Sequence, residues 1–197
     1  MNRLSEFKNA PVNQVITDKF PVMTYPSGKA PDVNLKNWRF SVYGLVEKEI
    51  RWSWDELMDF PQVLTTSDFH CVTQWSKFDN LWEGIQFSSI VSQLKLLPNS
   101  KYVMVHSYGG YSTNLDLETL LDDDVILAHH HNSAPLSLDH GGPLRLVVPK
   151  RYAWKSAKWI KSLEFKSSEQ PGFWESRGYH MRGNPWLEER YWPELQR

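Results

Sequence analysis

The segment HGGPLRLVVPKRYAWKSAKWIKSLEF, residues 140–165, carries two strand patterns and a run of basic residues. Its residues 144–148 (LRLVV) alternate in the period of a β-strand, with leucines on one face. Arg145 then points to the opposite face of that strand. A second strand is expected over residues 158–165. The segment therefore predicts two strands joined by a basic loop.

The loop between these strands predicts a site for an anion. Six basic residues and no acidic residue lie between Gly141 and Ser162. Arginine and lysine side chains that converge on a glycine-lined turn suit a phosphate or pyrophosphate. The backbone N–H groups at Ser156 and Ala157 would add donors. A solvated basic face is the alternative reading of the same charge pattern.

Outward from this segment, the chain predicts short strands and few helices. Further strands are expected over residues 38–46, 49–52, 63–69, 101–106 and 125–131. Helices are expected over Trp54–Phe60 with Ser53 as N-cap, over Phe87–Leu97 and over Leu117–Leu121. Together they indicate one mixed α/β domain of the α+β class over residues 1–197, with residues 1–35 as an extended lead-in and residues 167–197 as a docked aromatic tail.

Composition excludes several classes of protein. The 22 basic and 23 acidic residues nearly cancel, so no global field favours nucleic acid. No apolar stretch is long enough for a membrane span, and the first residues show no export signal. A single cysteine allows no intrachain disulfide. A cytoplasmic location without nucleic-acid or membrane partners is therefore expected.

The single cysteine, Cys71, follows a strand pattern and is flanked by His70 and Trp75. A lone cysteine can be a small buried hydrophobe, a nucleophile or a metal ligand, because the thiolate serves both kinds of chemistry. Strand alternation would place His129 and His131 on one face and His130 on the other. Cys71 with His129 and His131 would suit iron or zinc.

Three separated motifs resemble the sulfite oxidase family of molybdenum enzymes and the catalytic subunit of the periplasmic methionine-sulfoxide reductase. HCVTQWSKFDNLWEG, residues 70–84, resembles the family's cysteine loop. HNSAPLSLDHGGPLR, residues 131–145, resembles its "D-H-G-x-P-x-R" motif, and the segment 140–165 resembles that motif together with the strands and loop on its C-terminal side. The motifs agree in order and spacing over about residues 15–165.

The resemblance implies a sulfite-oxidase-type molybdopterin-binding domain that holds a molybdenum–molybdopterin cofactor. It implies that Cys71 is the protein ligand to the metal and that Tyr111 is a catalytic residue, hydrogen-bonded to an oxo group. The implied cofactor-binding residues, besides Cys71, are Lys19, Phe20, His70, Ser107, His140, Arg145, Ser156, Ala157 and Lys158.

The resemblance also implies oxygen-atom transfer to or from a small substrate of the sulfite, sulfoxide or N-oxide type, with a separate electron-transfer partner. Sulfite oxidases carry an arginine just after the cysteine, whereas residues 72–75 read VTQW here. Sulfite is therefore disfavoured as the substrate, unless Lys77, Arg177 or Arg182 takes the place of that arginine. The alternatives are the iron or zinc enzyme using Cys71, His129 and His131, and a noncatalytic binding module on the same fold.

Overall fold

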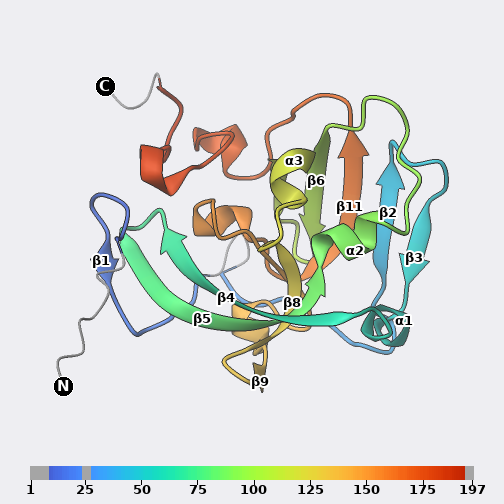
Figure 1. The fold of residues 1–197 in the computed structure, drawn as a ribbon, viewed down its shortest axis with the longest axis horizontal. Helices are drawn as coiled ribbons and strands as arrows, with labels where there is room; N and C mark the ends of the chain where they lie inside the picture. The colour runs from blue at the N-terminus through green and yellow to red at the C-terminus, as the bar shows by residue number, and fades with distance from the viewer. Residues whose placement is uncertain (1–8, 24–27, 194–197) are drawn as a thin grey trace.

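Two mixed β-sheets make up the fold in the computed structural model, which describes residues 9–23 and 28–193 (Figure 1). The first sheet has the order β1-β5-β8-β10, with β4 paired to β5 and β9 paired to β8. Its strands are β1 (Val15–Ile16), β4 (Gln62–Cys71), β5 (Trp75–Gln86), β8 (Ile126–His131), β9 (Ala134–Pro135) and β10 (Arg145–Val147).

The second sheet has the order β3-β2-β11-β6-β7. Its strands are β2 (Phe40–Gly44), β3 (Ile50–Trp52), β6 (Tyr102–Ser107), β7 (Ser112–Asp116) and β11 (Ile160–Lys166). Strand β11 pairs parallel with β2 and antiparallel with β6. Since β10 belongs to one sheet and β11 to the other, the basic loop is one of the connections between the two sheets. The α+β class is confirmed.

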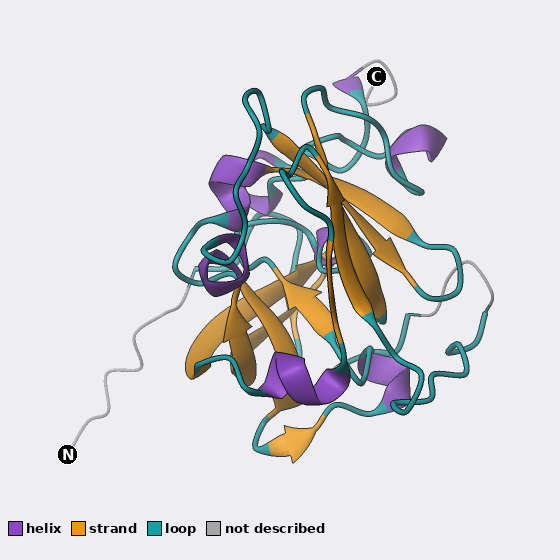
Figure 2. Ribbon diagram, turned by 90° about the vertical axis from the view of Figure 1, so that its right-hand side faces the viewer, coloured by secondary structure: helices purple, strands orange, loops and turns teal. Residues whose placement is uncertain are grey.

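The main core lies between the two sheets. Leu127 and Leu146 of the first sheet belong to the same buried cluster as Val105 and Leu163 of the second. Figure 2 shows the strands of the two sheets running in different directions, with most of the helices at the periphery. Among the described residues, no helix is both long and apolar enough to cross a membrane.

The described residues form three short α-helices, and each ends before its expected end, α2 by the widest margin. Helix α1 (Trp54–Met58) begins at the predicted cap, where Ser53 and Glu56 form a capping box. Helix α3 (Leu117–Leu120) agrees with its expected position. Helix α2 (Phe87–Val91) ends early, so the expectation of a helix to Leu97 is wrong. The chain turns there, and the N–H of Leu97 donates to Leu45 O beside the second sheet.

Strand β5 is long, although the sequence pattern predicts no strand over its residues. It spans 12 residues and pairs with β4 along most of its length. Its first half is polar, with Lys77 and Asn80, so it shows no apolar alternation. The turn between the strands is tight, and Gln74 within it has a φ of 68°. The hairpin therefore holds Cys71 at the end of β4.

A one-residue bulge in β8 changes which face of the strand each of its three histidines occupies. His130 pairs with Glu83 and Ala128 pairs with Gly84, so His129 is an extra residue on β8. The bulge breaks the alternation. His129 and His130 lie together, with 2.5 Å between their Nδ1 atoms. The prediction that His129 shares a face with His131, opposite His130, is therefore wrong.

Gly84 gives a test of the packing of β5 against β8. A Cβ at this position would overlap the carbonyl oxygen of Leu127 and lie 2.7 Å from Ala128 Cα. We predict that Gly84→Ala lowers the free energy of unfolding by about 3 kcal/mol, because overpacking forces the strands apart. Urea denaturation would measure it.

Gly110→Ala is the control for this substitution. Gly110 has a φ of 86°, but a Cβ added there would meet no atom within 4 Å. The free energy of unfolding of this variant should fall by about 1 kcal/mol, because only backbone strain is added. Equal losses in the two variants would contradict the close approach of β5 to β8.

Candidate cofactor site

A cavity of about 290 Å³ opens beside the end of β4 and the loop that joins β10 to β11. Aromatic side chains form much of its wall. The lining residues are Phe20, Pro21, Met23, Phe69, Cys71, Val72, Thr73, Trp75, Tyr111, His140, Arg145, Ala153, Trp154, Ser156, Ala157, Lys158, Trp159, Trp174 and Tyr179. The cavity therefore collects residues that are distant in the sequence.

Cys71 lies in this wall at the end of β4. Its Sγ is 3.1 Å from Thr73 Oγ1, and its carbonyl oxygen accepts a hydrogen bond from Gln14 Nε2 at 3.1 Å. Burial raises the pKa of the Cys71 thiol, although Thr73 and the charge of Arg190 oppose that rise. The thiol is therefore held in place, with a cation nearby that favours its thiolate form.

Arg145 is buried, with 3% of its surface exposed, and it faces the cavity from β10. Nη1 donates to His140 O at 2.9 Å and Nη2 donates to Ser156 O at 3.2 Å, while Nε has no partner in the described chain. No carboxylate of the described residues forms an ion pair with it. Burial lowers the pKa of Arg145 to about 9. A buried cation without an anion is costly, so the arrangement suits an anionic ligand.

The surroundings of Arg145 agree with the strand pattern of the sequence. Its guanidinium lies 5.1 Å from the Phe69 ring centroid and 5.3 Å from that of Trp82. Val147 packs in the same cluster as these two rings, whereas Leu146 packs in the main core. Arg145 therefore faces away from the buried leucines, as predicted.

Lys158 and His140 add positive or donor groups beside Arg145. Lys158 Nζ donates to Asp139 O at 2.7 Å, and burial followed by the charge of Arg145 lowers the pKa of Lys158 to about 8. The His140 ring stacks on Phe20 with centroids 4.4 Å apart. Burial, then Arg145, lowers the pKa of His140. These groups make one electropositive wall.

Gly141 permits this convergence. It has a φ of 106°, and a Cβ there would lie 2.9 Å from the side chain of Lys158. Ser156 and Ala157 also line the cavity, and Ser156 Oγ accepts from the N–H of Val148 at 3.0 Å. The predicted anion site is thus a formed pocket rather than a solvated basic face.

Other basic residues of the same segment are bound elsewhere. Lys150 pairs with Asp122, Arg151 lies 3.7 Å from Asp116, and the buried Lys155 pairs with Glu175. Two basic residues of this segment line the pocket, Arg145 and Lys158. They donate to backbone carbonyl oxygens and not to carboxylates. Their charges are therefore left for a ligand.

Three residues expected to bind the cofactor do not line the cavity. His70 precedes Cys71 on β4, so its side chain points to the other face and its Nδ1 lies 2.8 Å from Ser76 Oγ. Lys19 is exposed. Ser107 is buried and its Oγ has no partner in the described chain, but it lies outside the lining.

Tyr111 does line the cavity, but its hydroxyl is engaged. It donates to Trp154 O at 2.5 Å. Burial, then the charge of Glu175, raises the pKa of Tyr111 well above its ordinary value. The hydroxyl therefore stays protonated and acts as a donor.

The C-terminal segment contributes residues that sequence reasoning did not identify. Trp174 and Tyr179 line the cavity. Arg190 donates from Nη1 to Val72 O, and so supports the loop that follows Cys71. Its Nη2 is buried without a partner among the described residues. Nothing in the local pattern around Arg190 marks it, because the contact joins positions 118 residues apart.

The iron or zinc set of Cys71, His129 and His131 is not assembled. Cys71 lines the cavity, whereas His129 Nε2 lies 2.8 Å from Gln62 Oε1 and His131 Nε2 lies 3.0 Å from Asn80 Oδ1. Among the described residues, the group of three that can converge on a metal consists of Glu83, His129 and His130.

Comparison with known proteins identifies the family. Residues 27–174 match the oxidoreductase molybdopterin binding domain, and the chain belongs to that family. It is 41% identical over 182 residues to the uncharacterised oxidoreductase YuiH of Bacillus subtilis (strain 168), covering 92% of this chain and 91% of that one.

More distant relatives have established or provisional names. The putative protein-methionine-sulfoxide reductase subunit YedZ1 of Azospira oryzae is 29% identical, over 86% of this chain and 64% of that protein. The catalytic subunit MsrP of Campylobacter jejuni is 26% identical, over 84% of this chain and 63% of that protein. The chain thus spans less than two thirds of the length of these two relatives.

The sulfane dehydrogenase SoxCD of Paracoccus pantotrophus has the same fold. Its structure superposes with a TM-score of 0.66 at 23% identity, covering 72% of this chain and 41% of that one. The resemblance to sulfite-oxidase-type enzymes is confirmed, and the protein is a molybdopterin-dependent oxidoreductase with molybdenum–molybdopterin as its cofactor. The unpaired Arg145 Nε and the acid-free pocket of the described chain fit its anionic phosphate.

A buried ion pair fixes the C-terminal segment against the cavity wall. Lys155 Nζ lies 2.6 Å from Glu175 Oε1, and both side chains are fully buried. Trp154 Nε1 donates to the same oxygen at 3.0 Å and Thr113 Oγ1 donates to it at 2.8 Å. Glu175 therefore binds three groups of the body of the protein.

We predict that Glu175→Gln lowers the free energy of unfolding by about 3–5 kcal/mol, because Lys155 is left as an uncompensated buried cation. Thermal and urea denaturation would measure the loss. The double variant Lys155→Met/Glu175→Gln should recover at least half of it. A double variant as unstable as the single one would show that hydrogen bonds, and not the charge of Lys155, dominate the effect.

Proposed function

We propose that the protein transfers an oxygen atom between molybdenum and a small oxo-substrate, with Cys71 as the protein ligand to the metal. The observation that carries the proposal is the buried and unpaired Arg145, which lines the same cavity as the Cys71 thiol. Relatives named as nitrate reductases and as methionine-sulfoxide reductases support a substrate with a transferable oxygen.

The residues of the electropositive wall have proposed roles in holding the cofactor. When bound, the cofactor supplies the metal and its redox chemistry. Arg145 and Lys158 hold its phosphate by charge-assisted hydrogen bonds, aided by Ser156 and Ala157. His140, stacked on Phe20, forms the wall beside them. Binding roles for Lys19, His70 and Ser107 have no support from the lining of the cavity.

The aromatic lining of the cavity favours a neutral oxo-compound. Trp75, Trp174 and Tyr179 line it, and Val72 and Thr73 stand where sulfite oxidases carry an arginine. A neutral sulfoxide or N-oxide needs a donor and apolar contacts rather than a guanidinium. We therefore propose that class in preference to sulfite.

The cationic residues considered as substitutes for that arginine are not in the lining. Arg182 forms hydrogen bonds with Glu189, and Arg177 lies 3.7 Å from the ring centroid of Phe173. Lys77 is also absent from the cavity wall. The cation near Cys71 is Arg190, which donates to Val72 O and is likewise absent from the cavity wall. The electron-transfer partner and the cytoplasmic location stay predictions.

Cofactor content tests the assignment of Cys71 and Arg145. The protein would be made in a host that builds molybdopterin, and its molybdenum measured by plasma mass spectrometry. We expect about one molybdenum per chain, and a loss of turnover in Cys71→Ser because a metal–sulfur bond is removed. Arg145→Gln should lower cofactor occupancy about 10-fold or more, because charge-assisted contacts contribute roughly 1.5–3 kcal/mol each.

Lys161→Ala is the matched control, because Lys161 is an exposed cation of the same acid-free segment and does not line the cavity. It should retain full molybdenum and full sulfoxide or N-oxide reduction with a reduced dye as electron donor. Normal turnover in Cys71→Ser would overturn the metal ligand. Full occupancy in Arg145→Gln would overturn the phosphate contact.

We propose that, when the cofactor is bound, the Tyr111 hydroxyl turns its one hydrogen from Trp154 O to an oxygen at the reacting centre. We predict that Tyr111→Phe retains molybdenum but lowers kcat roughly 10-fold, since one donor to developing charge is lost. Steady-state rates normalised to molybdenum content would measure this. An unchanged kcat together with a lowered Tm would assign the hydroxyl a structural role through Trp154 O alone.

A further inference from the structure

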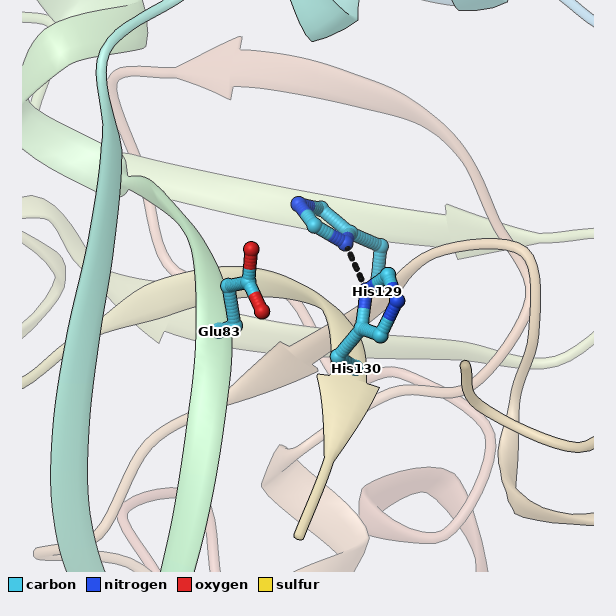
Figure 3. Close-up of side chains that lie close together, drawn as sticks. All are labelled: Glu83, His129 and His130. Atoms are coloured by element: carbon cyan, nitrogen blue, oxygen red, sulfur yellow. Dashed lines mark hydrogen bonds between the residues drawn. The ribbon is translucent and has the colours of Figure 1, made fainter. Parts of the chain in front are cut away.

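Three metal-ligating side chains meet outside the cofactor cavity. Glu83 projects from β5, and His129 and His130 project from β8, with donor atoms that all lie within 4.8 Å of one another. Figure 3 shows the Glu83 carboxylate directed toward the two imidazole rings. None of the three residues lines the cavity described above.

The bulge in β8 creates this arrangement. In a regular strand two successive side chains point to opposite faces. His129 is the inserted residue, so both imidazoles lie on one side, and Glu83 is the register partner of His130 on the neighbouring strand. The 2.5 Å between the two Nδ1 atoms shows that one of them carries a hydrogen and the other a lone pair.

Gln62 decides which nitrogen carries the lone pair. Its amide Nε2 donates to Phe60 O at 2.7 Å and to Met58 O at 3.3 Å, so both of its hydrogens are used. Its Oε1 must therefore accept a hydrogen from His129 Nε2, at 2.8 Å. His129 is then the tautomer with hydrogen on Nε2 and a lone pair on Nδ1.

This is the arrangement that metal-binding histidines use. A ligating imidazole donates its other N–H to an oxygen acceptor, which fixes the tautomer and the orientation of the ring. Gln62 supplies that acceptor.

We propose that Glu83, His129 and His130 form a binding site for one divalent transition-metal ion of the zinc type, separate from the molybdenum. Two imidazole nitrogens and one carboxylate oxygen are a ligand set suited to zinc, with water in the fourth position. A tetrahedral site with bonds of about 2.0–2.1 Å needs nitrogens roughly 3.3 Å apart. A small rotation of the partly exposed His130 provides this.

Binding needs a change of tautomer at His130. Its hydrogen leaves Nδ1 and Nε2 takes one up from solvent, so the ring stays neutral, and both Nδ1 atoms then offer lone pairs to the metal. The Glu83 carboxylate offsets one of the two positive charges. The proposed site shares only His129 with the set of Cys71, His129 and His131 that the sequence suggested.

Zinc binding to the molybdenum-containing protein tests the proposal. After dialysis against a chelator and then metal-free buffer, the protein would be titrated with Zn²⁺ by calorimetry, and its zinc and molybdenum measured together. We expect one Zn²⁺ per chain in addition to molybdenum. His130→Gln and Glu83→Gln should each weaken Zn²⁺ binding at least 10-fold, and Gln62→Leu about 10-fold through loss of the second contact.

His106→Gln is the matched control. His106 is a partly buried histidine on β6 whose Nε2 lies 3.0 Å from Glu164 Oε2, in the other sheet. It should bind Zn²⁺ as the wild type does, as should Cys71→Ser. Zinc absorption-edge spectroscopy should show an imidazole-containing shell at about 2.0–2.1 Å.

Zn²⁺ affinity that is equal in the wild type, His130→Gln and Glu83→Gln would overturn the site. So would the absence of a stoichiometric ion from the wild-type protein. Because molybdenum is measured in the same samples, a failure of zinc binding is distinguished from a failure of the proposed oxo-transfer site.

Discussion

The constraint on which this structure depends is the burial of Arg145 without a carboxylate from the described part of the chain. The desolvation of a guanidinium is expensive, and here aromatic rings and two backbone carbonyls compensate only part of it. An acid beside Arg145 would stabilise the empty protein but would compete with an anionic ligand. The pocket therefore gives up stability in the free state to gain affinity for the cofactor.

Strand alternation predicts that Arg145, the residue of β10 that lines this pocket, faces away from the main core. Residues 144–148 have apolar side chains on both faces, so Arg145 stands out as the polar exception. The charge pattern limits the candidates for anion binding to six basic residues. It does not show that Lys158 lines the pocket whereas Lys155 forms an ion pair. That distinction depends on Glu175, which packs beside Lys155 only in the folded chain.

The local sequence pattern does not predict a structure in which one inserted residue changes the strand register. It also does not predict contacts between residues that are far apart in the chain. The bulge at His129 is invisible in HHH, because a strand with and without it has the same composition. The long strand β5 is missed because its first half is polar. Its buried residues Ser76 and Asn80 are held by hydrogen bonds and give no apolar alternation. Arg190 and Tyr179 are missed because the tail that carries them reaches the cysteine loop through tertiary contacts alone.

The parallel pairing of β2 with β11 constrains when the fold can be completed. It joins residues near 42 to residues near 163, so the second sheet lacks a central strand until most of the chain has been synthesised. On the ribosome, the hairpin of β4 and β5 can form early, whereas β2 waits with an unpaired edge. Until β11 is made, that edge is open to pairing with other chains, which is a consequence of the order of the strands and not of the cofactor chemistry.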